Sequence, residues 1–78
     1  MKVSYKKLWV MLAEREMSKA ELRKLAGIAP ATFTKLGRNQ EVALSVLLRI
    51  AEVLDCDAGD IMCFVKESYP VPSTENNE

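Results

Sequence analysis

The chain has 78 residues, 49% of them hydrophobic and 28% charged, a composition that predicts one small globular domain without a membrane-spanning segment. Its formal net charge is zero and it has no histidine, so the commonest metal ligand and general base are both missing. Neither the spacing of Cys56 and Cys63 nor any glycine-rich loop indicates a metal, a cofactor or a small-molecule ligand, and we expect no enzymatic activity.

The first predicted helix runs from about Ser4 to Arg15. Leu8 and Leu12 lie four residues apart, so they share one helix face and are predicted to enter the core. Trp9 lies beside that face and either covers the edge of the core or stays on the surface. Four more helical segments follow, and since no strand pattern is comparably strong, we expect an all-α domain of five helices.

The second predicted helix covers about residues 18–26 and has the clearest start signal in the chain. Ser18 and Glu21 form a capping box, in which each side chain accepts a hydrogen bond from the main-chain N–H of the other residue. Gly27 ends the helix, because glycine adopts the left-handed conformation that terminates helices without steric cost.

The third predicted helix covers about residues 30–37 and starts after a turn of only a few residues. Pro30 suits the first helical position, where its missing N–H would have had no partner. Phe33 and Leu36 are three residues apart and are predicted to face the core. Because the turn is short, the second and third helices are expected to cross steeply, which leaves the outer face of the third without an apolar partner.

The fourth predicted helix, near Leu44 to Leu54, has the strongest periodicity and is expected to be central in the core. Its predicted core-facing stripe consists of Leu44, Leu47, Leu48, Ala51 and Leu54, with Ile50 at the border. A short fifth helix is predicted to begin at Asp57 as the N-cap. It would direct Ile61, Phe64 and Met62 toward the core.

The predicted domain covers residues 1–66, and residues 67–78 are interpreted as a mobile tail. The tail has two prolines, no basic residue and few side chains that form cores. At the other end, the basic start of the chain lacks the small-residue cleavage site of a signal peptide, which predicts a cytoplasmic location.

The charges are unevenly distributed along the chain. Residues 18–38 contain five basic side chains and one acidic side chain, a net charge of +4. Residues 41–67 contain two basic and six acidic side chains, a net charge of −4. One positive region on a neutral protein is compatible with docking on the phosphates of a nucleic acid.

The stretch from Met17 to Leu36, MSKAELRKLAGIAPATFTKL, contains two short helices joined at Gly27. Its pattern S-x-x-E-L-x-x-x-A-G-I-x-x-x-T-F-x-K-L resembles the Cro/CI-type helix-turn-helix family, and the later LLRIAEVLDCDAGDI resembles the stretch that completes the family's domain. The resemblance covers about Leu8 to Phe64. It implies a compact five-helix, lambda-repressor-like DNA-binding domain of a transcriptional regulator, with the second motif helix in the major groove of double-stranded DNA.

The resemblance also implies roles for individual residues. Lys19 stands where the family usually has a glutamine on a phosphate, and Arg38 matches a position that commonly holds a phosphate. Pro30, at the start of the motif's second helix, cannot hydrogen-bond to a base. The implied base-facing residues are Ala31, Thr32, Thr34 and Lys35, and the implied phosphate contacts are Ser18, Lys19 and Arg38. Arg23 and Gly37 depart from the small alanine and the acid that the family often has at these positions.

Two alternatives to DNA recognition stay open. The basic side chains of the second helix can form an ordinary solvated surface, and the helix-turn-helix can bind a protein partner, as in an antitoxin-like or adaptor module. The neutral net charge and the acidic second half favour a protein partner. If the partner is DNA, we expect a homodimer whose interface is either Met62, Cys63 and Phe64 or the YPVP segment at residues 69–72.

Overall fold

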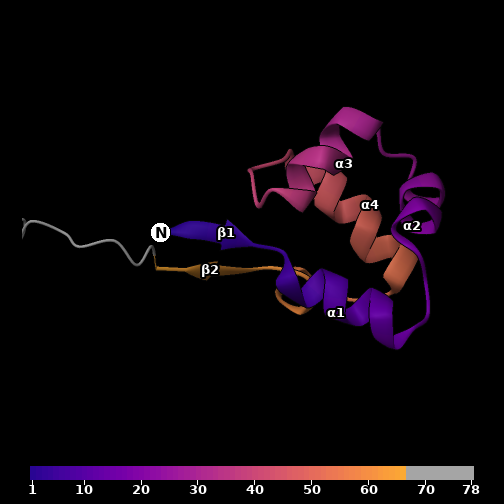
Figure 1. Ribbon diagram of the computed structural model, residues 1–78, viewed down its shortest axis with the longest axis horizontal. Coiled ribbons are helices and arrows are strands. Elements are labelled where there is room, and N and C mark those ends of the chain that lie inside the picture. Colours follow the sequence, from indigo (N-terminus) through magenta and orange to yellow (C-terminus); the bar gives the residue numbers. More distant parts are fainter. Residues whose placement is uncertain (67–78) are drawn as a thin grey trace, which may run out of the picture.

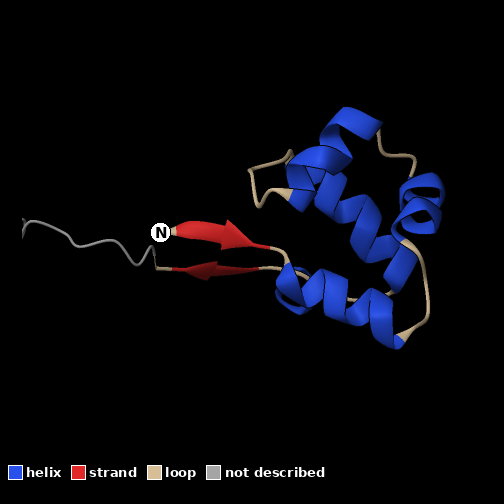
Figure 2. Cartoon of the chain, in the orientation of Figure 1, coloured by secondary structure: helices blue, strands red, loops and turns tan. Residues whose placement is uncertain are grey.

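Four α-helices and a two-stranded antiparallel sheet make up residues 1–66, the part of the chain that this computed structural model describes (Figure 1). In chain order the elements are β1 (Lys2–Ser4), α1 (Lys6–Glu14), α2 (Lys19–Ala26), α3 (Pro30–Gly37), α4 (Leu44–Leu54), a single 3-10 turn (Ala58–Asp60) and β2 (Cys63–Val65). The helices form one body and the strands project from it, away from α2 (Figure 2). In this part of the chain no helix is long and apolar enough to cross a bilayer.

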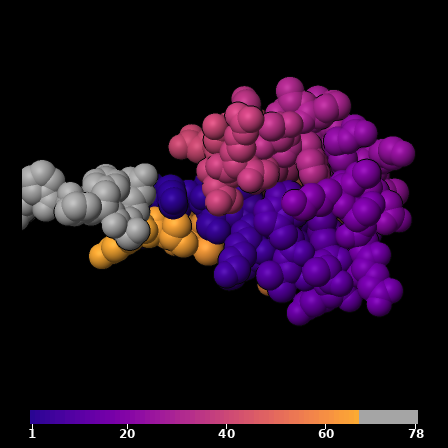
Figure 3. All heavy atoms as spheres, viewed as in Figure 1, coloured from indigo at the N-terminus to yellow at the C-terminus, as the bar shows by residue number. Residues whose placement is uncertain are grey.

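The core lies between the four helices, and every helix contributes to it. The side chains with no more than 1% of their surface exposed are Tyr5, Leu8, Leu22, Leu36, Ile50, Leu54 and Ile61. Leu8 and Leu12 of α1 are both buried, as predicted. Figure 3 shows the resulting surface, on which α2 lies at the end of the molecule opposite the strands and α3 lies along the upper side of this view. The core therefore holds α2 through Leu22 and Ala26 and α3 through Leu36.

The start and the end of α2 agree with the sequence prediction. The Ser18 hydroxyl oxygen accepts a 3.1 Å hydrogen bond from the Glu21 N–H, and a Glu21 carboxylate oxygen accepts a 2.9 Å bond from the Ser18 N–H. Gly27 ends the helix in the left-handed conformation, with φ of 65°. Pro30 occupies the first turn of α3, as expected. These local signals set both helices of the motif.

The predicted fifth helix is wrong. Asp57 does act as a cap, since its side-chain oxygen accepts a 2.8 Å hydrogen bond from the N–H of Ala58. The turn ends at Asp60, however, and is only one 3-10 turn long. Gly59 lies in the middle of this turn and is a poor helix former, so nothing local extends the turn into an α-helix.

The all-α fold class is corrected to a mostly helical domain with a small sheet. Cys63–Val65 forms β2 and pairs antiparallel with Lys2–Ser4, so that Val3 lies opposite Phe64. Valine and phenylalanine favour extended backbone, and each strand supplies the main-chain partners that the other needs. Ile61 is fully buried, as predicted, but Phe64 is 65% exposed instead of facing the core.

The bounds of α4 agree with the prediction, and the side that faces the core agrees in part, since Leu47 and Leu54 of the predicted stripe are buried. Its buried residues are Val46, Leu47, Ile50 and Leu54. Leu44 is 68% exposed and Leu48 is 60% exposed, although both belong to the predicted stripe. Eight of the eleven residues of this helix are apolar, so more than one apolar stripe satisfies its periodicity and only tertiary packing selects between them.

Candidate nucleic-acid interface

The turn between α2 and α3 is closed by main-chain hydrogen bonds. The N–H of Gly27 bonds to the carbonyl of Lys24 at 3.2 Å, and the N–H of Ile28 bonds to the carbonyl of Arg23 at 3.0 Å. This pair of bonds around a left-handed glycine is the Schellman motif, which satisfies carbonyls at a helix end. Ile28 is buried and anchors the turn to the core. The direction in which α3 leaves α2 is therefore fixed.

Two arginines hold the same turn from outside. The guanidinium of Arg49, on α4, donates a 3.1 Å hydrogen bond to the carbonyl of Gly27. The guanidinium of Arg23, on α2, donates a bond to the carbonyl of Ile28 at 3.4 Å. The side chain of Arg23 folds back onto the turn and is half-buried there. In this way it occupies a position where the resemblance implies a small side chain. Arg49 is a residue that the sequence prediction missed.

The outer face of α3 is exposed. Thr34 and Lys35 lie three and four residues after Ala31, so the three exposed residues share one face of the helix. Thr32 is half-buried and lies at the border of that face. Inward, Leu36 is fully buried, while Phe33 is half-buried and packs against the core instead of forming part of it.

The hydroxyl of Thr34 already has a partner within its own helix. It donates a 3.0 Å hydrogen bond to the carbonyl of Pro30, four residues earlier. Its oxygen can still accept a hydrogen bond, but it has no further donor to offer. Ala31 has no polar atom in its side chain, so Lys35 is the one charged group among the four predicted base-facing residues.

The three predicted phosphate contacts lie at the ends of α2 and α3. Ser18 and Lys19 are the N-cap and the first residue of α2, and Arg38 directly follows α3. All three are exposed. The N–H of Arg38 bonds to the carbonyls of Thr34 and Lys35, which fixes its position after the helix. The oxygen of Ser18 accepts a bond in the capping box, so its hydroxyl proton stays available for an anion.

Trp9 of α1 is half-buried and contacts both helices of the motif. The ammonium of Lys19 lies over its ring, 4.4 Å from the ring centroid. Its ring meets Phe33 edge-on, with the centroids 5.8 Å apart and the planes 65° apart. Of the two predicted positions for Trp9, the structure supports the edge of the core.

The two cysteines are free and half-buried. Burial, followed by the nearby Asp60 carboxylate, raises the pKa of the Cys56 thiol above its ordinary value of 9.0. This thiol is therefore protonated at neutral pH and is a weak nucleophile. Within residues 1–66 no group of three or more histidine, cysteine or acidic side chains is placed to hold a metal ion.

Comparisons with known proteins point to one family. Residues 7–67 match the family described as the Cro/C1-type HTH DNA-binding domain. The chain is 39% identical over 70 residues to YozG of Bacillus subtilis (strain 168), an uncharacterised HTH-type transcriptional regulator, covering 77% of this chain and 83% of YozG. The crystal structure of the transcriptional regulator VanUg superimposes with a TM-score of 0.83 at 52% identity, covering 85% of this chain and 88% of VanUg.

Proposed function

This chain belongs to the Cro/C1-type helix-turn-helix DNA-binding domain family, and we propose that α3 is its recognition helix, which lies in the major groove of duplex DNA. The chain is a DNA-binding transcriptional regulator and not an enzyme. A DNA partner also supports the predicted cytoplasmic location.

The observation that carries this proposal is the free outer face of α3. The turn before this helix is fixed by main-chain bonds and by Arg23 and Arg49, while Ala31, Thr34 and Lys35 are exposed. A rigidly held helix with one unused face fits the width of the major groove. Ser18 and Lys19 at the start of α2 and Arg38 directly after α3 are exposed as well, so they are available to phosphates.

Each exposed residue of the interface has a role that its chemistry allows. Lys35 can address the O6 and N7 acceptors of guanine, and Ala31 can contact the methyl group of thymine. Thr34 can only accept a hydrogen bond from a base, because its proton is used by the Pro30 carbonyl. Thr32 contributes through its exposed part at the edge of the face.

Ser18, Lys19 and Arg38 are proposed as phosphate contacts, which orient the domain without selecting a sequence.

The test of this proposal is the double variant Lys35→Ala/Arg38→Ala. Fluorescence polarisation with a duplex selected for binding should show an affinity lower by roughly ten- to a hundred-fold. The matched control is Lys6→Ala/Lys66→Ala, which removes the same charge from exposed positions outside α2 and α3. An equal loss of affinity in both double variants would contradict the proposal, because it would indicate only a general effect of net charge.

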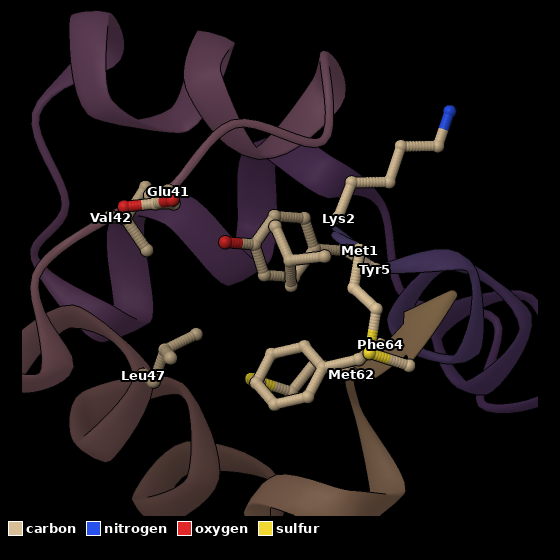
Figure 4. A pocket seen from close by; sticks show the side chains of 9 residues that line it. Met1, Lys2, Tyr5, Glu41, Val42, Leu47, Met62 and Phe64 are labelled. Carbon is tan, nitrogen blue, oxygen red and sulfur yellow. The ribbon is translucent and has the colours of Figure 1, made fainter. Parts of the chain in front are cut away.

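We further propose that the regulator acts as a homodimer, since two copies on half-sites about one DNA turn apart add the few base contacts of each domain. The proposed interface is a hollow of about 520 Å³ between the sheet and α4 (Figure 4). The side chains that line it are Met1, Lys2, Val3, Tyr5, Glu41, Val42, Leu47, Met62 and Phe64.

Charge favours a second copy as the occupant of this hollow. Lys2 and Glu41 lie on opposite sides of its apolar lining, as Figure 4 shows. A two-fold axis through the hollow would bring Lys2 of each copy to Glu41 of the other, because a symmetric interface pairs each surface with itself. Met62 and Phe64 of the predicted interface line this hollow, whereas Cys63 does not. Phe64 lies on β2 and Met62 directly precedes that strand. The YPVP alternative lies outside the described residues.

The dimer is tested by Phe64→Asp, which places a charge in the centre of the proposed interface. Phe64 is 65% exposed, so the folded monomer should tolerate the change. Sedimentation should show a loss of self-association, whereas Leu25→Asp, at a 63% exposed position on α2 outside the hollow, should leave it intact. A Phe64→Asp protein that still dimerises would contradict the proposed interface.

A further inference from the structure

Trp9 belongs to α1, outside the helix-turn-helix, yet it touches one residue from each of the motif's helices. Lys19 comes from the first residue of α2, and its ammonium lies 4.4 Å from the centroid of the indole ring. Phe33 comes from α3, and its ring lies edge-on to the indole at 5.8 Å. Trp9 is the only tryptophan of the chain. One side chain thus joins a proposed phosphate contact to the recognition helix.

The contact with Trp9 restricts a side chain that would otherwise be mobile. An exposed lysine has four rotatable bonds, and binding a phosphate requires it to lose that freedom. The attraction between a cation and the face of an indole ring holds Lys19 in place before DNA arrives. The ammonium carries three N–H donors, so it can lie on the ring and still direct a donor toward a phosphate oxygen.

The second contact of Trp9 acts on α3. Phe33 faces inward from the recognition helix and is only half-buried, so Trp9 forms part of the surface against which α3 rests. An edge-to-face pair has a preferred geometry, which a purely aliphatic contact lacks. A change at Trp9 therefore reaches both the phosphate contact and the helix that reads the bases.

We propose that Trp9 is a positioning residue for DNA binding, which holds the Lys19 ammonium for a phosphate and seats α3 through Phe33. This inference rests on the proposed role of α2 and α3 in DNA recognition. Trp9 itself does not touch the DNA. Part of its effect on affinity passes through Lys19, and this distinguishes it from an ordinary packing residue.

The main test is a double-mutant cycle between Trp9 and Lys19, measured as DNA affinity by fluorescence polarisation. Trp9→Leu should weaken binding by about two- to five-fold, the strength expected of an exposed cation–aromatic contact. In the Lys19→Ala background the same change should weaken binding less, because only the effect through Phe33 remains. Trp9→Phe should restore most of the loss, since phenylalanine keeps an aromatic face. Equal losses from Trp9→Leu with and without Lys19 would overturn the inference.

A spectroscopic test needs no change at Trp9 and so does not depend on the folding of a Trp9 variant. Lys19→Ala should alter the Trp9 emission of the free protein, whereas Lys24→Ala, another exposed lysine of α2, should not. DNA should change the emission of the wild type and of Lys24→Ala more than that of Lys19→Ala. Indistinguishable emission of the two variants, free and DNA-bound, would overturn the inference.

These results separate the inference from the proposed function. If the folded wild type does not bind DNA at low salt, the proposed function fails. If the wild type binds DNA but the effects of Trp9→Leu and Lys19→Ala simply multiply, only the role of Trp9 fails.

Discussion

The hydroxyl of Tyr5 donates a 2.8 Å hydrogen bond to the main-chain carbonyl of Gln40, which lies 35 residues further along the chain. The N–H of Tyr5 also bonds to the side-chain oxygen of Asn39 at 3.0 Å. Asn39 has a positive φ of 56°, so its side chain stabilises a backbone conformation that most residues avoid. The junction of β1 and α1 thus holds the segment that follows α3.

Tyr5→Phe should lower the free energy of unfolding by about 1–2 kcal/mol, because it removes the hydroxyl and leaves the Gln40 carbonyl without this donor. The ring of Tyr5 is 1% exposed and its packing is kept in phenylalanine. Urea denaturation measures the change. An unaltered m-value would show that the folded and unfolded states of the variant are as compact as those of the wild type. A midpoint equal to that of the wild type would contradict a stabilising role for this bond.

The same hydroxyl predicts how stability depends on alkaline pH. Burial, and next the negative charge of Glu41, raise the pKa of Tyr5 above its ordinary value of 10.0. The unfolded chain therefore releases this proton at a lower pH than the folded protein. The stabilisation by the Tyr5 hydroxyl is complete below the pKa of the unfolded chain, and it declines as the pH rises through the pKa of the folded protein. The difference in stability between wild type and Tyr5→Phe should shrink above about pH 10. A constant difference up to pH 11, measured by urea denaturation, would argue against the raised pKa.

Two glycines at the ends of the motif's helices should respond in opposite directions to alanine. Gly27→Ala should destabilise the domain by about 1 kcal/mol, because φ is 65°, even though an added Cβ would meet no atom within 4 Å. Gly37→Ala is the matched control, since it also has open space but lies within α3 without a positive φ. It should stabilise by up to about 1 kcal/mol. Thermal melting compares the two, and shifts of the same sign would refute this explanation.

Arg49→Met should separate support of the turn from contact with DNA. It removes the bond to the Gly27 carbonyl while keeping most of the aliphatic stem, and should cost about 1 kcal/mol of stability. Because the guanidinium is engaged within the domain, the salt dependence of DNA binding should not change. Unchanged stability together with a smaller salt dependence would instead identify Arg49 as a phosphate contact.

The parts of the fold that the sequence predicts depend on neighbouring residues. Ser18 and Glu21 lie three residues apart, and Gly27 and Pro30 act at their own positions, so the bounds of α2 and α3 follow from local chemistry. The outer face of α3 follows as well, because Leu36 faces the core. The sequence also predicts Thr32 on that face, but Thr32 is half-buried and lies at the border of the face.

The parts that the sequence does not predict depend on residues far apart in the chain. β1 and β2 are three residues long and pair across about sixty intervening residues, so neither strand has a pattern of its own. The bond from Arg49 to Gly27 and the contact between Trp9 and Lys19 likewise arise only when the helices pack. In α4 the sequence offers several apolar faces, and packing buries Ile50 while leaving Leu44 exposed.

Titration of the wild-type protein against random duplex DNA at two salt concentrations shows whether the domain docks on DNA, as proposed for α2 and α3. Fluorescence polarisation should show micromolar binding at low salt that weakens steeply as salt rises, with a slope of about −0.9 for each phosphate contact. Absence of binding at low salt, while circular dichroism shows a folded helical protein, would contradict the claim and favour a protein partner for the outer face of α3.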